Sequence, residues 1–233
     1  MEYIANEGKK VSITVNGEVY LRHAIKTHFV KSGENYIDVI RKYLSEIYRE
    51  GDIVSISEKI IAICQGRIVK REDIKIGALA RFLSYFACRK NRGGYGVGMP
   101  INMQYAINKA GRVRVLIGSL LGGFCKLFGV KGVFYKIVGR EVAGLDGFYD
   151  GAWEEYRDIG IEIPSDPRGV CRKIREKLGM SCMIVDANDF GQVILGKSDD
   201  IEYDEETLAA MIRDNPAGQR RECTPLILIR KAK

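Results

Sequence analysis

The chain has 233 residues and a formal net charge of +7, from 37 Lys plus Arg against 30 Asp plus Glu. Its hydrophobic content of 46% excludes a disordered chain and suffices for one large domain or two small ones. The longest uncharged apolar run, residues 115–125, is far shorter than the ~20 residues of a membrane-spanning helix. The first residues show no apolar signal segment, so we expect a cytoplasmic protein with no membrane partner.

The predicted elements alternate between strand and helix. In chain order, the first half is expected to form two hairpin strands around Asn16-Gly17, an amphipathic helix, two Ile- and Val-rich strands and two further helices: residues 11–15, 18–22, 36–49, 53–57, 59–64, 78–89 and 100–110. Residues 113–128 are apolar with interspersed small residues, and are either a buried strand and helix or a subunit contact. The second half is expected to form a strand, a helix capped by Asp166, a strand, a helix and a final strand: residues 133–138, 168–178, 181–185, 204–213 and 224–230. The fold class is therefore α/β or α+β, with mixed sheets and flanking helices.

Cysteine and histidine are too sparse for a zinc site. Six cysteines are spread without a CxxC pair, and the histidines are His23 and His28. We expect free thiols in a reducing compartment. Any bound metal would need carboxylate ligands, which favours Mg²⁺ or Mn²⁺.

The charges are unevenly distributed. Residues 1–140 hold 24 basic and 11 acidic side chains, whereas residues 141–233 hold 13 basic and 19 acidic ones, so these could be two sub-domains. From Ile74 to Arg140 there are twelve Lys or Arg and no Asp or Glu. A phosphorylated small molecule with a metal is the favoured reading, and neutralisation within the fold or between subunits is the second. Nucleic acid is the least favoured, because no nucleic-acid motif is present.

Several polar segments carry side chains suited to chemistry. The glycine loop at Arg92–Gly98 could cradle phosphate or be a mobile loop. The acidic turn at residues 143–150 could hold a cation or be exposed. Residues 184–191 place acidic side chains where a buried strand ends. They are either a ligand site or a plain Asp–Asn turn. The connection at residues 214–225 either contacts phosphate or is a plain surface loop. The charged pair within residues 57–59 either meets a ligand or is exposed at a strand end. The histidine within residues 26–29 is either a hydrogen-bonded structural residue or a catalyst.

Six motifs in one order carry a family resemblance. They are I-x-T-H, G-D-I-V-x-I-S-E-K-x-x-A-I-x-Q-G-R, A-G-hydrophobic-D, D-P followed by a helix, I-V-D-A-N-D-x-G and G-Q-x-x-E-x-T-P. From about residue 22 onward the chain resembles the coenzyme F-420-0:L-glutamate ligase (γ-glutamyl ligase) family. The resemblance implies one domain over residues 1–233, an α/β fold of the family's own type and an intertwined homodimer.

The resemblance also implies an activity. Such ligases use GTP and two divalent metals to phosphorylate a substrate carboxylate, and the amine of glutamate then attacks the acyl phosphate. Mn²⁺ or Mg²⁺ would be the metal, and ATP could replace GTP. A folate-type glutamate ligase and a non-catalytic protein that binds a nucleotide or an anionic metabolite are the alternatives, and DNA or RNA binding is a third hypothesis.

Site residues follow from the motifs by position. Asp146 matches one metal ligand and Asp186 the second, with Asp189 in that place if a gap is allowed. The nucleotide-contacting positions correspond to Thr27, His28, Glu58, Lys59, Gly218, Gln219 and Glu222. The basic span would supply substrate-phosphate contacts from Arg92, Arg112 and Arg114.

The chain departs from the family pattern at two places. Ile63 stands where ligases commonly have a nucleotide-contacting Lys. Gly147, Phe148 and Tyr149 replace the usual residues after the acidic turn. Nucleotide and metal binding is therefore better supported by the sequence than a deazaflavin substrate.

Overall fold

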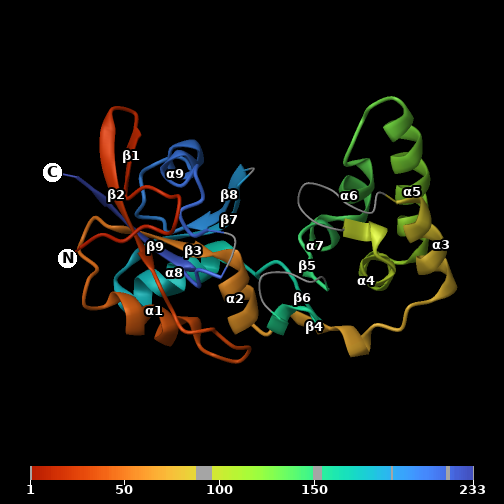
Figure 1. Cartoon of the computed structure of the whole chain (residues 1–233), viewed down its shortest axis with the longest axis horizontal. Coiled ribbons are helices and arrows are strands. Elements are labelled where there is room, and N and C mark those ends of the chain that lie inside the picture. Colours follow the sequence, from red (N-terminus) through yellow and green to blue (C-terminus); the bar gives the residue numbers. More distant parts are fainter. Residues whose placement is uncertain (1, 88–95, 149–153, 190, 219–220, 233) are drawn as a thin grey trace. The chain divides into compact units, whose positions relative to one another are not determined.

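Two compact units make up the chain in a computed structural model that describes residues 2–87, 96–148, 154–189, 191–218 and 221–232 (Figure 1). Unit 1 comprises residues 1–67 and 164–233, and unit 2 comprises residues 68–163. The boundaries between the units do not coincide with the change of charge at residue 140. The single family domain over residues 1–233 stays a prediction.

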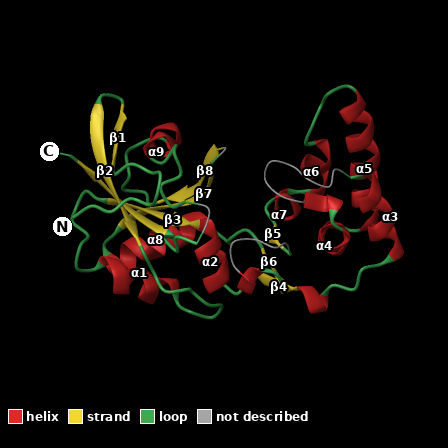
Figure 2. Ribbon diagram, viewed as in Figure 1, coloured by secondary structure: helices red, strands yellow, loops and turns green. Residues whose placement is uncertain are grey.

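Unit 1 is built on a six-stranded mixed sheet in the order β1-β2-β9-β3-β7-β8 (Figure 2). Strands β3 and β7 pair in parallel, and the other neighbours are antiparallel. The strands are β1 (Ser12–Val15), β2 (Glu18–Ile25), β3 (Ile53–Ser57), β7 (Ser181–Asn188), β8 (Gly191–Lys197) and β9 (Leu226–Lys231). This confirms the mixed α/β class.

Helices cover both faces of this sheet. They are α1 (Tyr36–Leu44), α2 (Glu58–Cys64), α8 (Pro167–Leu178) and α9 (Glu205–Met211). Along β3 and β7, successive residues enter opposite cores: Ile56 and Ile184 pack with α1, α2 and α8, whereas Met183 and Val185 pack with α9. Burial on both faces explains why the central strands read as continuous apolar runs.

Local sequence signals account for most element boundaries in unit 1. The Asn16-Gly17 turn has positive φ at both residues and joins β1 to β2, as predicted. Asp166 caps α8 by accepting a hydrogen bond from the Gly169 amide at 3.0 Å, also as predicted. The strand predicted at residues 59–64 is wrong, because these residues form α2. An apolar run this short fits either state.

The described part of unit 2 contains five helices and a small three-stranded sheet (Figure 1). The strands of this sheet lie in the order β4-β6-β5. Its elements are α3 (Ala78–Phe86), α4 (Pro100–Ala110), α5 (Arg112–Leu127), α6 (Val133–Val138), α7 (Arg140–Ala143), β4 (Ile68–Lys70), β5 (Asp146–Gly147) and β6 (Ile159–Ile161). The strand predicted at residues 133–138 is wrong, since α6 is a helix packed on α5.

The small residues of α5 have a role inside unit 2. Gly118 and Gly122 face α6 so closely that an added Cβ would lie 3.3 Å and 3.2 Å from Phe134. The absence of side chains there therefore permits the close approach of α5 and α6. Residues 112–127 form one helix, so the alternative that contains a buried strand is wrong, and Gly118 and Gly122 are occupied within the unit.

The two points where the chain leaves and re-enters unit 1 are joined by hydrogen bonds. The Gln65 side chain donates to Ser165 O at 2.9 Å and accepts from Ser165 N at 2.8 Å. All five described cysteines are free thiols, as predicted. Among the described residues, no helix has both the length and the apolar character to cross a membrane.

Candidate functional site

Four predicted segments meet at one edge of the unit 1 sheet. Ile25 at the end of β2 and Ile56 near the end of β3 both pair with Leu226, the first residue of β9. Ser57 at the end of β3 pairs with Val185 of β7. The segments that follow β2 and β3, end β7 and precede β9 are therefore neighbours. Their predicted site residues are Thr27, His28, Glu58, Lys59, Asp186, Asp189, Gly218 and Glu222.

Backbone hydrogen bonds connect three of these segments. The Thr27 amide donates to Cys223 O at 2.9 Å, and the Ser57 amide donates to Pro225 O at 2.9 Å. Thr27 is buried, and its hydroxyl donates to His28 O at 2.9 Å. The loop before β9 thus lies between the Thr27-His28 turn and the start of α2, although more than 150 residues separate it from either in sequence.

His28 has a fixed orientation. Its Nδ1 lies 2.8 Å from Tyr43 Oη, and its Nε2 lies 2.7 Å from Glu34 Oε2. The ring also stacks on Tyr43. Burial disfavours ionisation of Glu34, but the Lys31 amide and the His28 ring outweigh it and lower the pKa of Glu34. His28 therefore stands beside a carboxylate that stays charged.

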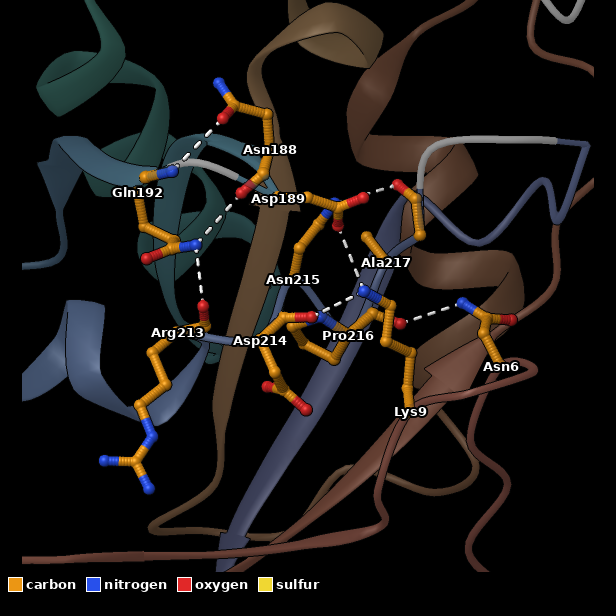
Figure 3. Close-up of polar contacts among 12 residues, drawn as sticks. Asn6, Lys9, Asn188, Asp189, Gln192, Arg213, Asp214, Asn215, Pro216 and Ala217 are labelled. Carbon is orange, nitrogen blue, oxygen red and sulfur yellow. Dashed lines mark hydrogen bonds and ion pairs between the residues drawn. The ribbon is translucent and has the colours of Figure 1, made fainter.

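Asp189 is held by a lysine and an asparagine (Figure 3). Lys9 Nζ lies 3.1 Å from Asp189 Oδ1, and it also donates to Asp214 O at 2.7 Å. Asn215 Nδ2 donates to Asp189 Oδ1 at 3.3 Å and to Gly218 O at 3.2 Å. One oxygen of Asp189 thus already faces a cation. Asp186 is exposed, and it lies within β7, which extends three residues beyond the predicted end at residue 185.

The loop before β9 has a strained, closely packed backbone. Asn215 is fully buried at φ 50°, and its Oδ1 has no protein hydrogen-bond partner among the described residues. Gly218 has φ 74°, and an added Cβ would lie 2.7 Å from the Glu222 carboxyl carbon. The Gly218 amide donates to Asn215 O at 3.0 Å, so it closes the turn instead of pointing at a phosphate.

A buried arginine anchors the same loop. Arg22 is 2% exposed, and its guanidinium forms two hydrogen bonds to Asp214 and one to Lys10 O at 2.6 Å. Burial disfavours a charged Asp214, but the Arg22 guanidinium outweighs it and lowers the pKa of Asp214. This ion pair ties the loop to β2, whose continuation carries Thr27.

Glu58 and Lys59 open α2, and both are half-buried. Ile63 lies on the same helix with 5% of its surface exposed, in the hydrophobic interior. Ile63, which the family resemblance places at a lysine position, is therefore part of the core. Burial and the charge of Glu34 raise the pKa of Cys64, the last residue of α2, to about 11.

The remaining predicted site residues belong to unit 2 or lie outside the described residues. Asp146 is half-buried and begins β5, where Gly147 approaches Ile159 O too closely for any side chain. Arg112 and Arg114 are exposed on α5, and Arg114 Nε donates to Ile137 O at 2.6 Å. Arg92, Gln219 and Asp150 lie outside the described residues.

The described carboxylates of this edge do not form a complete metal centre by themselves. They fit a metal ion whose remaining ligands come from a bound phosphate and water. No group of three or more His, Cys, Asp or Glu side chains in the described parts could hold an ion. Mg²⁺ often binds one or two carboxylates together with substrate phosphates and water. Asp186 and Asp189 at one strand end match that sparser arrangement.

Sequence reasoning missed two residues of this edge. Lys9 contacts Asp189 across 180 positions of sequence, and no local pattern marks it. Asn215 was within the predicted loop but was not singled out. The Asn-Pro pair at residues 215 and 216 is a turn signal that could have identified it.

Comparison with known proteins supports the resemblance over part of the chain. A family model described as F420-0:Gamma-glutamyl ligase matches residues 24–96. The uncharacterized protein MJ1361 of Methanocaldococcus jannaschii is 30% identical over 85 residues, which are 35% of this chain and 28% of that protein. The matched residues thus span little more than a quarter of the relative's length. The matched family is one of ligases, and its segment includes Thr27, His28, Glu58 and Lys59.

Proposed function

We propose that the protein is a nucleotide- and metal-dependent amide ligase that joins glutamate, or another amino acid, to a carboxylate of an anionic substrate. GTP or ATP would phosphorylate the carboxylate, and the amine would displace phosphate from the acyl phosphate. The observation that carries the proposal is the meeting of four polar segments at one sheet edge. Two of them lie within the residues that match the ligase family model.

The side chains of this edge would bind the nucleotide and the metal, each in a separate role. Lys59 and the loop at Gly218 and Glu222 would contact the nucleotide, with Thr27 and His28 holding the neighbouring turn. Asp186 and Asp189 would bind Mg²⁺ or Mn²⁺ together with nucleotide phosphates, and Asp146 of unit 2 stays a metal ligand that only the family resemblance implies. The metal would neutralise phosphate charge during transfer. Arg112, Arg114 and Arg92 are proposed to attract the anionic substrate.

Two further features belong to the proposal. The homodimer is carried over from the family resemblance, and the cytoplasmic location from the free cysteines. A folate-type acceptor is a variant, because the reaction requires a free carboxylate and does not depend on the deazaflavin. Sedimentation velocity would test the dimer, which predicts twice the mass of the 26.2 kDa chain.

The first experiment is isothermal titration calorimetry with GTP and ATP, each with Mn²⁺, Mg²⁺ or a chelator. We expect metal-dependent micromolar binding, reduced at least about tenfold by Asp186→Asn. The control is Asp199→Asn, an exposed carboxylate after β8 at the opposite end of the sheet. Equal loss in both variants, or binding that ignores the metal, would contradict the site.

A second variant tests the loop without changing a charge. Gly218→Ala places a Cβ against the Glu222 carboxylate at a positive φ, which costs about 1–2 kcal/mol. We expect weaker nucleotide binding with a nearly unchanged metal dependence. Gly51→Ala, at φ 88° but with open space around it, is the matched control for backbone strain alone.

One observation favours a second candidate, a binding protein without turnover. Ile63 supplies no positive charge, and it lies in the core where ligases commonly have a lysine. Such a protein would bind nucleotide yet release no phosphate with any acceptor. Mass spectrometry of reactions with glutamate and mixed carboxylic acids separates the two, because only a ligase forms a product heavier than its acceptor.

A further inference from the structure

Exposed apolar side chains are concentrated in unit 2. In the described parts of the chain, fifteen large hydrophobic residues are exposed, and all but Ile4, Val19 and Val193 fall between residues 82 and 130. Single exposed apolar residues are ordinary, but a contiguous group usually marks a binding surface. The group includes Leu120 at 73% and Leu127 at 82% exposure.

Helix α5 carries the largest share of this group. Its Gly118 and Gly122 are turned toward α6, whereas seven large apolar residues on the helix are exposed. These seven recur at spacings of three and four, so they share one side of the helix. We call this side the α5 face: Val113, Leu116, Ile117, Leu120, Leu121, Phe124 and Leu127.

Only positive charges accompany the α5 face along the chain. Residues 74–140, which include α3, α4, α5 and α6, contain no Asp or Glu. On α5 itself, Arg112, Arg114 and Lys126 are exposed. At 100° per residue, Arg112 and Arg114 project to either side of the apolar face, whereas Lys126 lies about 150° from its centre, nearer the side that is turned to α6. The helix thus presents an apolar strip between positive charges.

The charges distinguish among the occupants that could cover this face. In a two-fold dimer the same surface meets itself, so these two arginines would approach their own copies without a carboxylate from residues 74–140. An anionic lipid surface offers apolar chains below and negative headgroups at the level of the charges. At 16 residues, α5 is about 24 Å long and too short to span a ~30 Å hydrocarbon core.

We propose that the α5 face binds peripherally to membranes that contain anionic phospholipids, with its apolar residues in the headgroup boundary and its basic residues at the phosphates. The helix would lie in the membrane surface and would not cross the bilayer. The lack of a spanning helix among the described residues bears on a membrane-crossing segment, and an interfacial contact needs none. The proposed contact does not depend on the nucleotide and metal site of unit 1, but it uses Arg112 and Arg114, which are proposed above to attract the anionic substrate.

The test is flotation of the full chain with phosphatidylcholine vesicles and with vesicles containing 30% phosphatidylglycerol. We expect binding to the anionic vesicles that weakens as salt rises, because exposed charges are screened. Leu120→Glu should lower the partition coefficient at least about tenfold, since it removes an apolar contact and adds a like charge to the lipid. Arg112→Gln should lower it about fivefold.

Two further variants make the result specific. Leu127→Glu repeats the change at the most exposed apolar position, and circular dichroism verifies that each variant is folded. Val193→Glu places the same change on an exposed strand residue of unit 1 and should leave vesicle binding unchanged. The proposal is overturned if the wild type ignores anionic vesicles or if Leu120→Glu and Val193→Glu behave alike. A stable dimer that Leu120→Glu separates, without vesicle binding, would instead assign the face to a second copy.

Discussion

The two units use apolar residues in opposite ways. Unit 1 buries its apolar strands on both faces of a sheet and keeps polar residues for one edge. Unit 2 has a smaller core around α4 and leaves one side of α5 apolar and exposed. Three helices of unit 1 have side-chain caps, at Asn35, Asp166 and Asp204, whereas α3 to α7 have none. Local capping signals and a large buried core therefore define the fold of unit 1 more strongly than that of unit 2.

The largest effect should come from the unit 1 core. Ile184→Ala removes a fully buried side chain from β7 and should cost about 2–5 kcal/mol of unfolding free energy. Leu120→Ala on α5 should change it by less than about 0.5 kcal/mol, because the side chain is exposed. Urea denaturation followed by circular dichroism measures both. Equal losses would mean that α5 is covered in solution.

A smaller effect is expected from the Arg22–Asp214 pair. Asp214→Asn leaves the buried Arg22 without its counter-charge and should cost about 2 kcal/mol, less than a fully buried pair because Asp214 is partly exposed. The lowered pKa of Asp214 means that its contribution is present above about pH 4 and lost as pH falls through the folded-state pKa. As the pH is lowered from 7 to 3, stability should therefore fall more steeply in the wild type than in Asp214→Asn.

Capping gives the next effect. Asn35 accepts a hydrogen bond from the Ile37 amide at 2.9 Å, so Asn35→Ala should destabilise α1 by about 1 kcal/mol. Asn35→Asp keeps the acceptor and serves as the matched control, with near wild-type stability. If thermal unfolding shows that both variants lose the same stability, the cap is not the cause.

The smallest effect concerns thiol reactivity and leaves stability unchanged. With a pKa of about 11, only about one thousandth of Cys64 is thiolate at pH 8. Alkylation by iodoacetamide, read out by peptide mass spectrometry, should therefore be slow in the folded protein and fast in urea. Rapid labelling of Cys64 in the folded protein would show that α2 opens readily.

Sequence patterns predicted unit 1 better than unit 2. The hairpin at Asn16-Gly17 and the cap at Asp166 are local signals, and both are confirmed. Residues 59–64 and 133–138 were predicted as strands because Ile and Val favour strands, but packing against neighbours made them helices. Tertiary context overrides propensity most easily in such short apolar runs.

The candidate site was predicted as separate segments rather than as an arrangement. The residues after β2 and β3 and before β9 were identified from their polar character and the family motifs. That Leu226 pairs with both Ile25 and Ile56 follows only from strand order, which these motifs do not encode. The Lys9–Asp189 contact depends on the path of the amino-terminal segment and had no sequence signal.

The Gln65–Ser165 hydrogen bonds close the base of a long excursion of the chain. Joining two ends about 100 residues apart costs roughly 4 kcal/mol of loop entropy, and that cost grows only with the logarithm of length. Insertions or deletions within residues 68–163 would thus hardly affect the closure of unit 1. Evolution could therefore replace the residues of unit 2, including those proposed to meet the substrate, while the closure of the unit 1 sheet is kept.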